Sequence, residues 1–578
     1  MTTASPTIVH PKVFAEDGTP ATMALAVRFR ESALARSLER HAFVAVVLIV
    51  ALGFGLRIRG LDGAGFNEDE IQKVSAARAY LQGDFSRNLE HPMLMKSMIA
   101  VSLAAADRWN RGIGRSRPVS DEFAVRFPNV VFGALTAGVI FALAGEFFSV
   151  EVALLSALLW SAGTIAIIDN RLAKEDTLLV FFAWLGYYFY IRAKKASAIN
   201  ARQYAKPYGK WYVAAGASFG LMLASKYFPH YLALIFLYYY LPSNRKEYPP
   251  LCRRDFLLLL GTCALVFLIA NPVILFPGTV KYFLHYVAEG TMSHHGYLMM
   301  GHFYFNDPAH LHGGMPFYFY FLMLAIKTPL PVLAALGVGL VEVTRHRREA
   351  GASFLILMSL FWIVPFSILS AKWLRWMLAW MPMIYIIAAI GFVKIFSWTR
   401  SLAMESRSRL LAPALNVLLF IVFLAQPLWT AVKAGPFHSL YLNPLGLGRT
   451  GYYFPHDEFA DAGLRPTIFK ICKEAAAGST VGGEAPPVFA YYFHQCGRGD
   501  LHYFSLSEAH RETLPPSTYL VVQDGRKYFE NISFIQEITS EENPAWTTAI
   551  EGVPAATVYR TSEVTELRNW HDPKISLR

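Results

Sequence analysis

Apolar stretches alternate with clusters of lysine and arginine along most of this chain. A helix that crosses a bilayer needs about 20 apolar residues, and cytoplasmic loops of membrane proteins are enriched in Lys and Arg. The basic clusters lie at residues 28–40, 192–210, 245–254, 345–348 and 400–409. If these clusters all face the cytoplasm, the loops between them face the opposite side. The acidic motif Glu68-Asp69-Glu70 lies in one of those opposite loops.

Composition agrees with a chain that crosses the membrane many times. Hydrophobic residues make up 54% and charged residues only 16%, whereas soluble proteins average about 25% charged residues. The formal net charge of +11 is spread over separate loops. No basic stripe interleaved with aromatic residues is present, and such a stripe is typical of nucleic-acid binding. The charge therefore indicates membrane orientation and argues against a nucleic-acid partner.

The apolar stretches predict a polytopic α-helical membrane protein with about eleven transmembrane helices. An N-terminal segment, residues 1–40, is predicted to be cytoplasmic and to hold no cleavable signal peptide. The transmembrane domain is predicted at residues 41–432, and the apolar piece at 93–105 is interpreted as interfacial. The predicted spans are 41–56, 123–147, 150–168, 177–191, 211–224, 228–241, 256–276, 317–343, 354–369, 376–395 and 410–432.

An odd number of spans with a cytoplasmic N-terminus places residues 433–578 outside the cytoplasm. Their composition is that of a soluble domain, with helical spacing at 466–477 and strand-like runs at 487–492, 519–523 and 557–560. We therefore predict a small extracytoplasmic α/β domain. Cys472 and Cys496 both lie in it, and the sequence leaves open whether they form a disulfide.

Charged residues gather in the loops that are predicted to lie outside. Carboxylates beside cations suit a reaction with a hydroxyl nucleophile and an anionic leaving group, because the carboxylate takes the proton and the cations stabilise the leaving group. Individually, these residues have simpler explanations, such as helix caps, interfacial anchors or solvated loop charges. The histidines match no compact spacing of metal ligands. The candidates are Asp69, Glu70, His91, Lys96, Arg171, Asp176, Lys226, His294, His295 and Arg375.

The order of these residues resembles the protein O-mannosyltransferases, glycosyltransferase family 39. Asp69-Glu70 followed by the segment from Glu90-His91-Pro92 to Lys96 is similar to the family's Asp-Glu and His-Pro-Pro-Leu-x-Lys signatures. Further elements of the family resemble Arg126-Phe127-Pro128, Arg171 with Asp176, and Gly220 with Ser225-Lys226.

Three departures from the family pattern suggest a bacterial member. Met93 replaces the second proline, Trp376 replaces the tyrosine after Arg375, and no β-trefoil insertion is evident between the seventh and eighth spans. Bacterial relatives include protein glycosyltransferases and the aminoarabinose transferases that modify lipid A. The acceptor class therefore stays open between a protein and a lipid.

The resemblance implies a GT-C architecture in the plasma membrane and an inverting transfer of a sugar from a polyprenyl-phosphate carrier to an acceptor hydroxyl. Asp69 would be the general base, and Glu70 would orient it or bind the acceptor. The remaining roles, also implied by the resemblance, are the donor phosphate for Arg171, Lys226, Arg375, Lys96 and His91, and the sugar or acceptor for Asp176, Arg126, His294 and His295. Neither a metal nor another cofactor is needed for this chemistry.

A transporter or flippase is the main alternative of another class. Transporters place their key polar groups near the bilayer midplane, on broken helices related by internal repeats. Here the polar groups lie at the outer ends of the predicted spans, and no repeat is visible. A non-catalytic scaffold would leave the Asp69-Glu70 pair without a task, so the sequence favours an enzyme.

Overall fold

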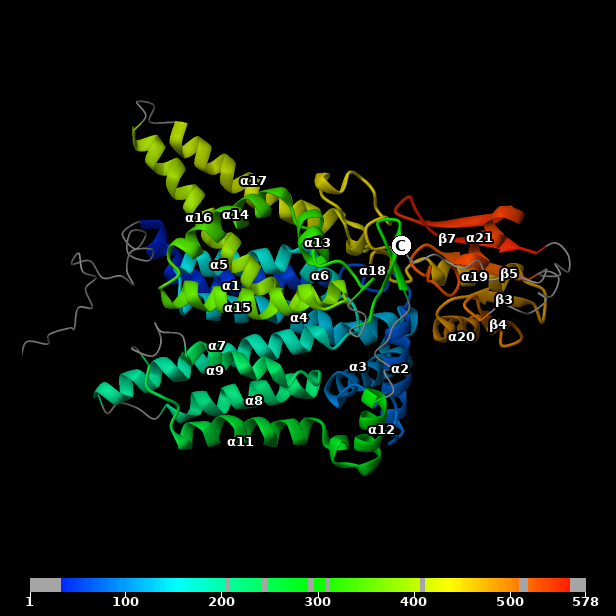
Figure 1. The fold of residues 1–578 in the computed structure, drawn as a ribbon, viewed down its shortest axis with the longest axis horizontal. Helices are drawn as coiled ribbons and strands as arrows, with labels where there is room; N and C mark the ends of the chain where they lie inside the picture. The colour runs from blue at the N-terminus through cyan, green and yellow to red at the C-terminus, as the bar shows by residue number, and fades with distance from the viewer. Residues whose placement is uncertain are drawn as a thin grey trace, which may run out of the picture.

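A computed structural model describes residues 33–203, 208–240, 248–288, 296–307, 312–405, 411–508 and 518–561. It shows a bundle of long helices and a smaller unit built around a β-sheet (Figure 1). Shorter helices lie where the two parts meet, and they come from the first predicted external loop and from the segment that follows the seventh predicted span.

The bundle forms two layers of packed helices around a shared apolar core. Its helices are α1 (Ala33–Ile58), α4 (Asp121–Gly145), α5 (Val150–Ala162), α6 (Thr164–Asn170), α7 (Asp176–Gln203), α8 (Gly209–Ser225), α9 (Ala233–Tyr240), α11 (Arg253–Ala270), α13 (Phe319–Lys327), α14 (Leu330–Arg345), α15 (Ala350–Ile368), α16 (Met381–Glu405) and α17 (Leu411–Lys433). Helices α1, α4 and α5 pack together, and α4 leads through α7 and α8 to α11. On the other side, α5 packs against α16, which also contacts α14 and α17.

Five helices in the described part of the chain are long and apolar enough to cross a membrane, or six if a bent pair counts as one span. These figures support a helical membrane protein. The predicted number of eleven is not reached by this measure, although each predicted span overlaps at least one described helix. Several of these helices are short; α8, for example, has 17 residues. The five are His41–Ile58, Asp121–Gly145, Ala350–Ile368, Met381–Thr399 and Ala414–Lys433.

The bent pair consists of α5 and α6, which meet at 56°. Gly163 lies at the bend, and a Cβ atom there would come within 2.0 Å of the Tyr385 hydroxyl. Only glycine therefore allows the chain to pass this close to α16. The bend directs the end of α6 toward the loop that carries Arg171 and Asp176.

The eighth predicted span, 317–343, is not one helix. It is divided into α13 and α14 at Thr328 and Pro329. Proline lacks the N–H that a helix interior requires, and it disfavours helical backbone in the residue before it. At the break, Lys327 Nζ lies 3.3 Å from Glu458 Oε1, so the end of α13 is tied to the C-terminal region.

The first external loop forms two helices, α2 (Glu68–Leu81) and α3 (Met93–Arg111), which pack against each other. Helix α12 (Pro277–Ala288) lies at the same end of the bundle (Figure 1). A short antiparallel hairpin, β1 (Gly296–Met299) and β2 (His302–Phe305), follows. The single-turn 3-10 helices are η1 (Ile113–Ser116), η2 (Pro229–Leu232), η3 (Pro272–Leu275), η4 (Leu374–Ala379), η5 (His438–Leu440) and η6 (Pro444–Gly446).

The C-terminal region holds a five-stranded mixed sheet with the order β4-β3-β5-β7-β6. Strand β3 is parallel to β4 and β5, while β7 is antiparallel to β5 and β6. The elements are α18 (Pro455–Phe459), α19 (Leu464–Glu474), β3 (Thr480–Gly483), α20 (Pro486–Gln495), β4 (His502–Ser505), β5 (Tyr519–Gln523), α21 (Ile532–Glu541), β6 (Pro544–Ile550) and β7 (Val553–Arg560).

Most of the elements predicted for this region are confirmed, and one is wrong. The predicted helix at 466–477 corresponds to α19, and the predicted strands at 519–523 and 557–560 lie in β5 and β7. The predicted strand at 487–492 is instead part of α20, because two prolines open the helix and its buried side chains recur at helical spacing. Cys472 and Cys496 carry free thiols in this structure.

Candidate active site

Helix α2 begins with three carboxylates, and a capping box fixes its first turn. Asn67 Oδ1 accepts a hydrogen bond from the Glu70 backbone N–H at 3.0 Å, and the Asn67 N–H donates to Glu70 Oε2 at 3.1 Å. Carboxylates are favoured here because they face the positive end of the helix dipole. Asp69 and Glu70 lie in the first turn of this helix, and Asn67 is its cap. This arrangement leaves the Asp69 side chain 46% exposed.

Glu70 points into the protein and binds Arg126 of α4. Arg126 Nε lies 2.8 Å from Glu70 Oε1 and Nη2 lies 2.7 Å from Oε2. The Ala173 N–H also donates to Glu70 Oε1, and the other Arg126 donors reach backbone carbonyls of residues 61, 64 and 65. Both side chains are buried and occupied. Glu70 and Arg126 therefore bind each other inside the protein, and the roles predicted for them toward Asp69, the sugar or the acceptor stay predictions.

Asp69 faces two cations that come from different elements. Lys174, in the loop between α6 and α7, forms an ion pair with Asp69 Oδ2, and Arg375 Nη1 of η4 lies 4.0 Å from the same oxygen. The Arg375 guanidinium rests on the Trp373 ring, 4.5 Å from its centroid. Burial, followed by the charge of Arg375, lowers the pKa of Lys174 well below its usual value. An exposed carboxylate is thus held beside the side chains of Lys174 and Arg375.

A second pair of contacts lies next to this one. Lys226, which follows α8, donates from Nζ to Asp176 Oδ1 at 2.9 Å. Glu175 Oε1 lies 3.1 Å from Lys73 Nζ and 3.6 Å from His91 Nδ1. Burial lowers the pKa of His91 to about 4, so its ring is neutral near pH 7. The side chains of α2, α7 and the first loop are thereby joined.

These residues form one group, which we call the charged cluster: Asp69, Lys73, His91, Lys174, Glu175, Asp176, Lys226 and Arg375. The charges of Arg375, Glu175, Asp176 and Lys226 all act on Lys174, which places them around it. Five of the predicted site residues are among the members. A carboxylate that can take a proton therefore lies beside cations that can stabilise a phosphate.

Two further predicted site residues, Arg171 and Lys96, are held by backbone carbonyls. The Arg171 guanidinium donates to the carbonyls of Arg57, Arg59 and Gly60 at 2.7–2.8 Å, so Asp176 holds Lys226 instead of Arg171. The Lys96 ammonium binds carbonyls of residues 87, 88 and 91, and it therefore orders the first loop. His294 and His295 lie outside the described residues.

The sequence did not single out Lys73, Lys174 or Glu175 as site residues. A signal for each was present. Lys174 and Glu175 directly precede Asp176 in the same short loop, and Lys73 follows Asp69 by four residues, which places both on one face of α2. Only the fold shows that these residues converge, because α2 and the start of α7 are distant in sequence.

Two other features bear on the chemistry. No group of three His, Cys, Asp or Glu side chains in the described ranges is arranged to hold a metal ion. A cavity of about 700 Å³ lies between the start of α4 and the C-terminal region, lined by residues that include Glu122, Arg465 and Phe469. No member of the charged cluster lines this cavity, so the two are separate features.

Comparison with known proteins places the fold. Residues 119–276 match the family model for dolichyl-phosphate-mannose-protein mannosyltransferases, and the matched segment includes Lys174, Asp176 and Lys226. The apo oligosaccharyltransferase from Archaeoglobus fulgidus is similar in structure, with a TM-score of 0.50 at 11% identity over 83% of this chain and 69% of that chain. This chain has a GT-C fold. The expected resemblance to the mannosyltransferases is therefore confirmed.

Two further solved structures are similar to this GT-C protein. ArnT from Cupriavidus metallidurans bound to undecaprenyl phosphate has a TM-score of 0.47 at 14% identity, over 90% of this chain and 98% of that chain. The archaeal oligosaccharyltransferase AglB from Archaeoglobus fulgidus, in complex with an inhibitory peptide and a dolichol-phosphate, has a TM-score of 0.48 at 10% identity. The match covers 80% of this chain and 64% of that chain. No curated protein matches the sequence.

Proposed function

We propose that this GT-C protein is a glycosyltransferase that moves mannose from a polyprenyl-phosphate carrier to a Ser or Thr hydroxyl of a protein. The observation that carries the proposal is the exposed Asp69 carboxylate held against Lys174 and Arg375 at one end of the helix bundle. The family match over residues 119–276 supports the choice of sugar and donor. The distribution of Lys and Arg supports an extracytoplasmic position for this site in the plasma membrane.

The chemistry proceeds as one displacement. Asp69 takes the proton of the acceptor hydroxyl while the acceptor oxygen forms a bond to the anomeric carbon of the sugar. The bond from that carbon to the phosphate oxygen breaks, and its electron pair remains on the phosphate. Arg375 and Lys226 stabilise the negative charge that develops there. Attack opposite the leaving phosphate inverts the anomeric centre.

The members of the charged cluster divide the remaining work. Lys174 keeps Asp69 in place in the resting enzyme. Asp176 orients Lys226, and Glu175 links Lys73 to His91 so that the first loop lies against α7. Loss of a single donor to the developing charge lowers such a rate by roughly 100- to 1,000-fold.

Transfer of label from radiolabelled polyprenyl-phosphate-mannose tests the proposal. Membranes that contain the wild-type chain, Asp69→Asn or Asp84→Asn would be incubated with the donor, and protein and lipid fractions would be counted separately. Asp84 is a matched control because it is an exposed carboxylate just after α2 with no contact to the charged cluster. We expect label in protein for the wild type and Asp84→Asn, and none for Asp69→Asn.

Other outcomes would correct particular parts of the proposal. Label in a lipid fraction would assign the acceptor to the cell envelope while leaving the donor and mechanism in place. Equal transfer by Asp69→Asn and the wild type would remove Asp69 from the mechanism. If the wild type, Asp84→Asn and Asp69→Asn are all folded and the wild type transfers no label from this donor, the choice of mannose is contradicted.

A further inference from the structure

The C-terminal region contacts the backbone segments that carry Asp69 and Arg375. Arg526 Nη1 donates to Glu68 Oε2 at 2.8 Å, and Glu68 directly precedes Asp69 in α2. Asp457 Oδ2 accepts a hydrogen bond from the Leu374 backbone N–H at 2.7 Å, and Leu374 directly precedes Arg375 in η4. Asp69 and Arg375 face each other in the charged cluster. The C-terminal region thus holds each of them through the residue that precedes it in the chain.

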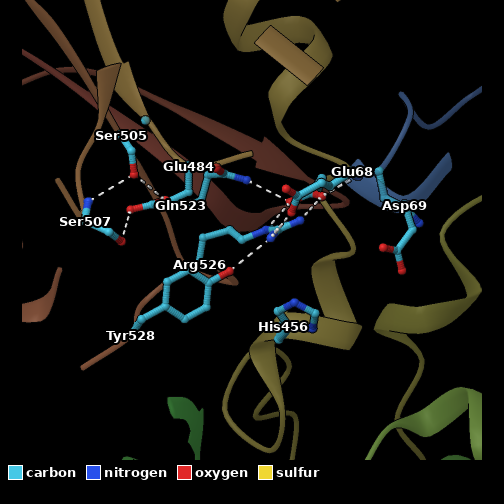
Figure 2. Close-up of polar contacts among 12 residues, drawn as sticks. Glu68, Asp69, His456, Glu484, Ser505, Ser507, Gln523, Arg526 and Tyr528 are labelled. Carbon is cyan, nitrogen blue, oxygen red and sulfur yellow. Dashed lines mark hydrogen bonds and ion pairs between the residues drawn. The ribbon is translucent and has the colours of Figure 1, made fainter. Parts of the chain in front are cut away.

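The contact at α2 is built around Arg526, whose guanidinium donates several hydrogen bonds. Figure 2 shows Arg526 extending toward Glu68 from the segment that follows β5, with Asp69 on the other side of Glu68. The Arg526 guanidinium binds Asp461 through Nε at 2.8 Å and Nη2 at 2.5 Å, and its Nη1 also donates to the Tyr528 hydroxyl at 3.0 Å. Asp461 in turn accepts the Glu68 backbone N–H at 3.3 Å. Both the side chain and the backbone of Glu68 are therefore bound.

Asp461 is set in an unusual backbone conformation for this purpose. Its φ is 62°, and the preceding Ala460 has a φ of 46°, so two consecutive non-glycine residues lie in the left-handed region. Such residues are costly and persist where the surrounding structure holds them. Although burial opposes it, the charge and hydrogen bonds of Arg526 keep the pKa of Asp461 low. An ionised carboxylate is thus fixed under the first turn of α2.

The contact at η4 is also charged and buried. His456 Nδ1 lies 2.9 Å from Asp457 Oδ1, and its ring packs 5.4 Å from that of Trp373. Burial opposes ionisation of Asp457, but the hydrogen bond from His456 and the charges of His456 and Arg375 lower its pKa. The Trp373 ring also packs against the Arg375 guanidinium. The position of Arg375 is therefore set by the group of Trp373, His456 and Asp457.

We infer that the C-terminal region sets the separation between Asp69 and Arg375, with Arg526 and Asp457 as positioning residues. The inference rests on the proposed function for its effect on rate, but not for the contacts themselves. Displacement of a reacting group by about 1 Å can cost on the order of 100-fold in rate. The domain is therefore part of the catalytic apparatus even though neither positioning residue touches the substrate.

A double-mutant cycle tests the α2 contact. Arg526→Gln and Glu68→Gln would be compared singly and together in full-length protein, with transfer rates and donor KM measured for each. We expect each single variant to lower kcat by roughly 10- to 100-fold with little change in donor KM, and the double variant to be no worse than the poorer single one. Multiplied losses in the double variant would show that Arg526 does not act through Glu68.

The η4 contact has a built-in rescue variant. Asp457→Asn keeps an oxygen that can accept the Leu374 N–H, whereas Asp457→Ala removes it. We expect Asp457→Ala to raise donor KM and lower kcat, and Asp457→Asn to recover most of the rate. Arg498→Gln is the matched control, because Arg498 binds Asp500 and carbonyls of the same region without reaching the charged cluster. A loss in Arg498→Gln equal to that in Arg526→Gln would reduce the effect to general stability.

Hydrogen–deuterium exchange separates failure of this inference from failure of the proposed function. The amides of Glu68 and Leu374 donate directly to Asp461 and Asp457. Peptides that contain these amides should exchange faster in Arg526→Gln and Asp457→Ala, respectively, but not in Arg498→Gln, whether or not any sugar is transferred. Unchanged exchange in both variants would overturn the inference. Faster exchange together with wild-type transfer rates would show that the contacts exist but do not position the site.

Discussion

Replacement of Arg126 by methionine should destabilise the protein more than any change to an exposed ion pair. Methionine has a similar length but no donor, so Arg126→Met leaves the Glu70 carboxylate buried without a cation. It also removes the guanidinium N–H groups that donate hydrogen bonds to three loop carbonyls. The first turn of α2, and with it Asp69, would lose its anchor on α4.

The size of this effect follows from the burial of the pair. Arg126 and Glu70 side chains are 2% and 0% exposed, so the charge that remains cannot be rescued by water. Removal of one partner from such a pair costs about 3–5 kcal/mol. If roughly 400 residues unfold together, the unfolding entropy is about 0.8 kcal/mol/K, and the Tm should fall by about 4–6 °C.

Thermal unfolding of detergent-purified protein, followed with a thiol-reactive fluorescent dye, measures this change. The buried free thiols of Cys263 and Cys472 become accessible as the fold opens. Arg87→Met is the control, since Arg87 and Asp84 form an exposed pair at 3.6 Å and its loss should leave the Tm nearly unchanged. The reasoning is refuted if Arg126→Met and Arg87→Met unfold at the same temperature. A double variant that adds Glu70→Gln removes the stranded charge and should recover part of the loss.

Three further changes probe the cluster and the fold. Lys226→Met should raise donor KM and lower the transfer rate by roughly 100-fold, whereas an unchanged rate would exclude Lys226 from phosphate stabilisation. The pKa of His91 is lowered to about 4 in the folded state from about 6.5 when unfolded. The unfolded chain therefore binds more protons between these values, and stability falls as the pH drops from 6.5 to 4. The Tm measured across this window should fall less steeply for His91→Gln than for the wild type, and parallel curves would contradict the assignment. Gly163→Val should prevent α5 from approaching Tyr385 and lower the yield of folded protein in size-exclusion chromatography, while Gly261→Val, where the added Cβ would have no neighbour within 4 Å, should not.

Local rules predicted much of the helical part of this fold. The apolar runs at 123–147 and 150–168, for example, correspond to α4 and to the bent pair of α5 and α6. The apolar run at 317–343 was predicted as one span, but it breaks at Pro329. A proline can break or kink a helix, but α4, α15 and α17 each continue through an internal proline, so the presence of a proline alone does not predict a break.

The convergence of the site could be predicted only in part. Asp69, Lys226 and Arg375 were selected because they lie near the predicted external ends of the spans and because their order resembles a family, and the fold brings them together. Arg171 and Lys96 were selected by the same argument, but both satisfy backbone carbonyls. A sequence shows that a cation is present, but it does not show which acceptors surround it. Asp457 and Arg526 carry no local signal, since Leu374 lies 83 positions from Asp457 and Glu68 lies 458 positions from Arg526.

The separation of these partners along the chain also determines when in synthesis the site can be completed. Glu68 and Arg526 are 458 positions apart, and Phe66 donates its N–H to the Tyr492 hydroxyl across 426 positions. While the chain is being made, α2 therefore waits for partners that leave the ribosome last. A polypeptide that stops short of Arg526 would carry Asp69 and Arg375 but not the contact at Glu68 that sets their spacing. Premature termination would yield an inert product rather than a partly active one.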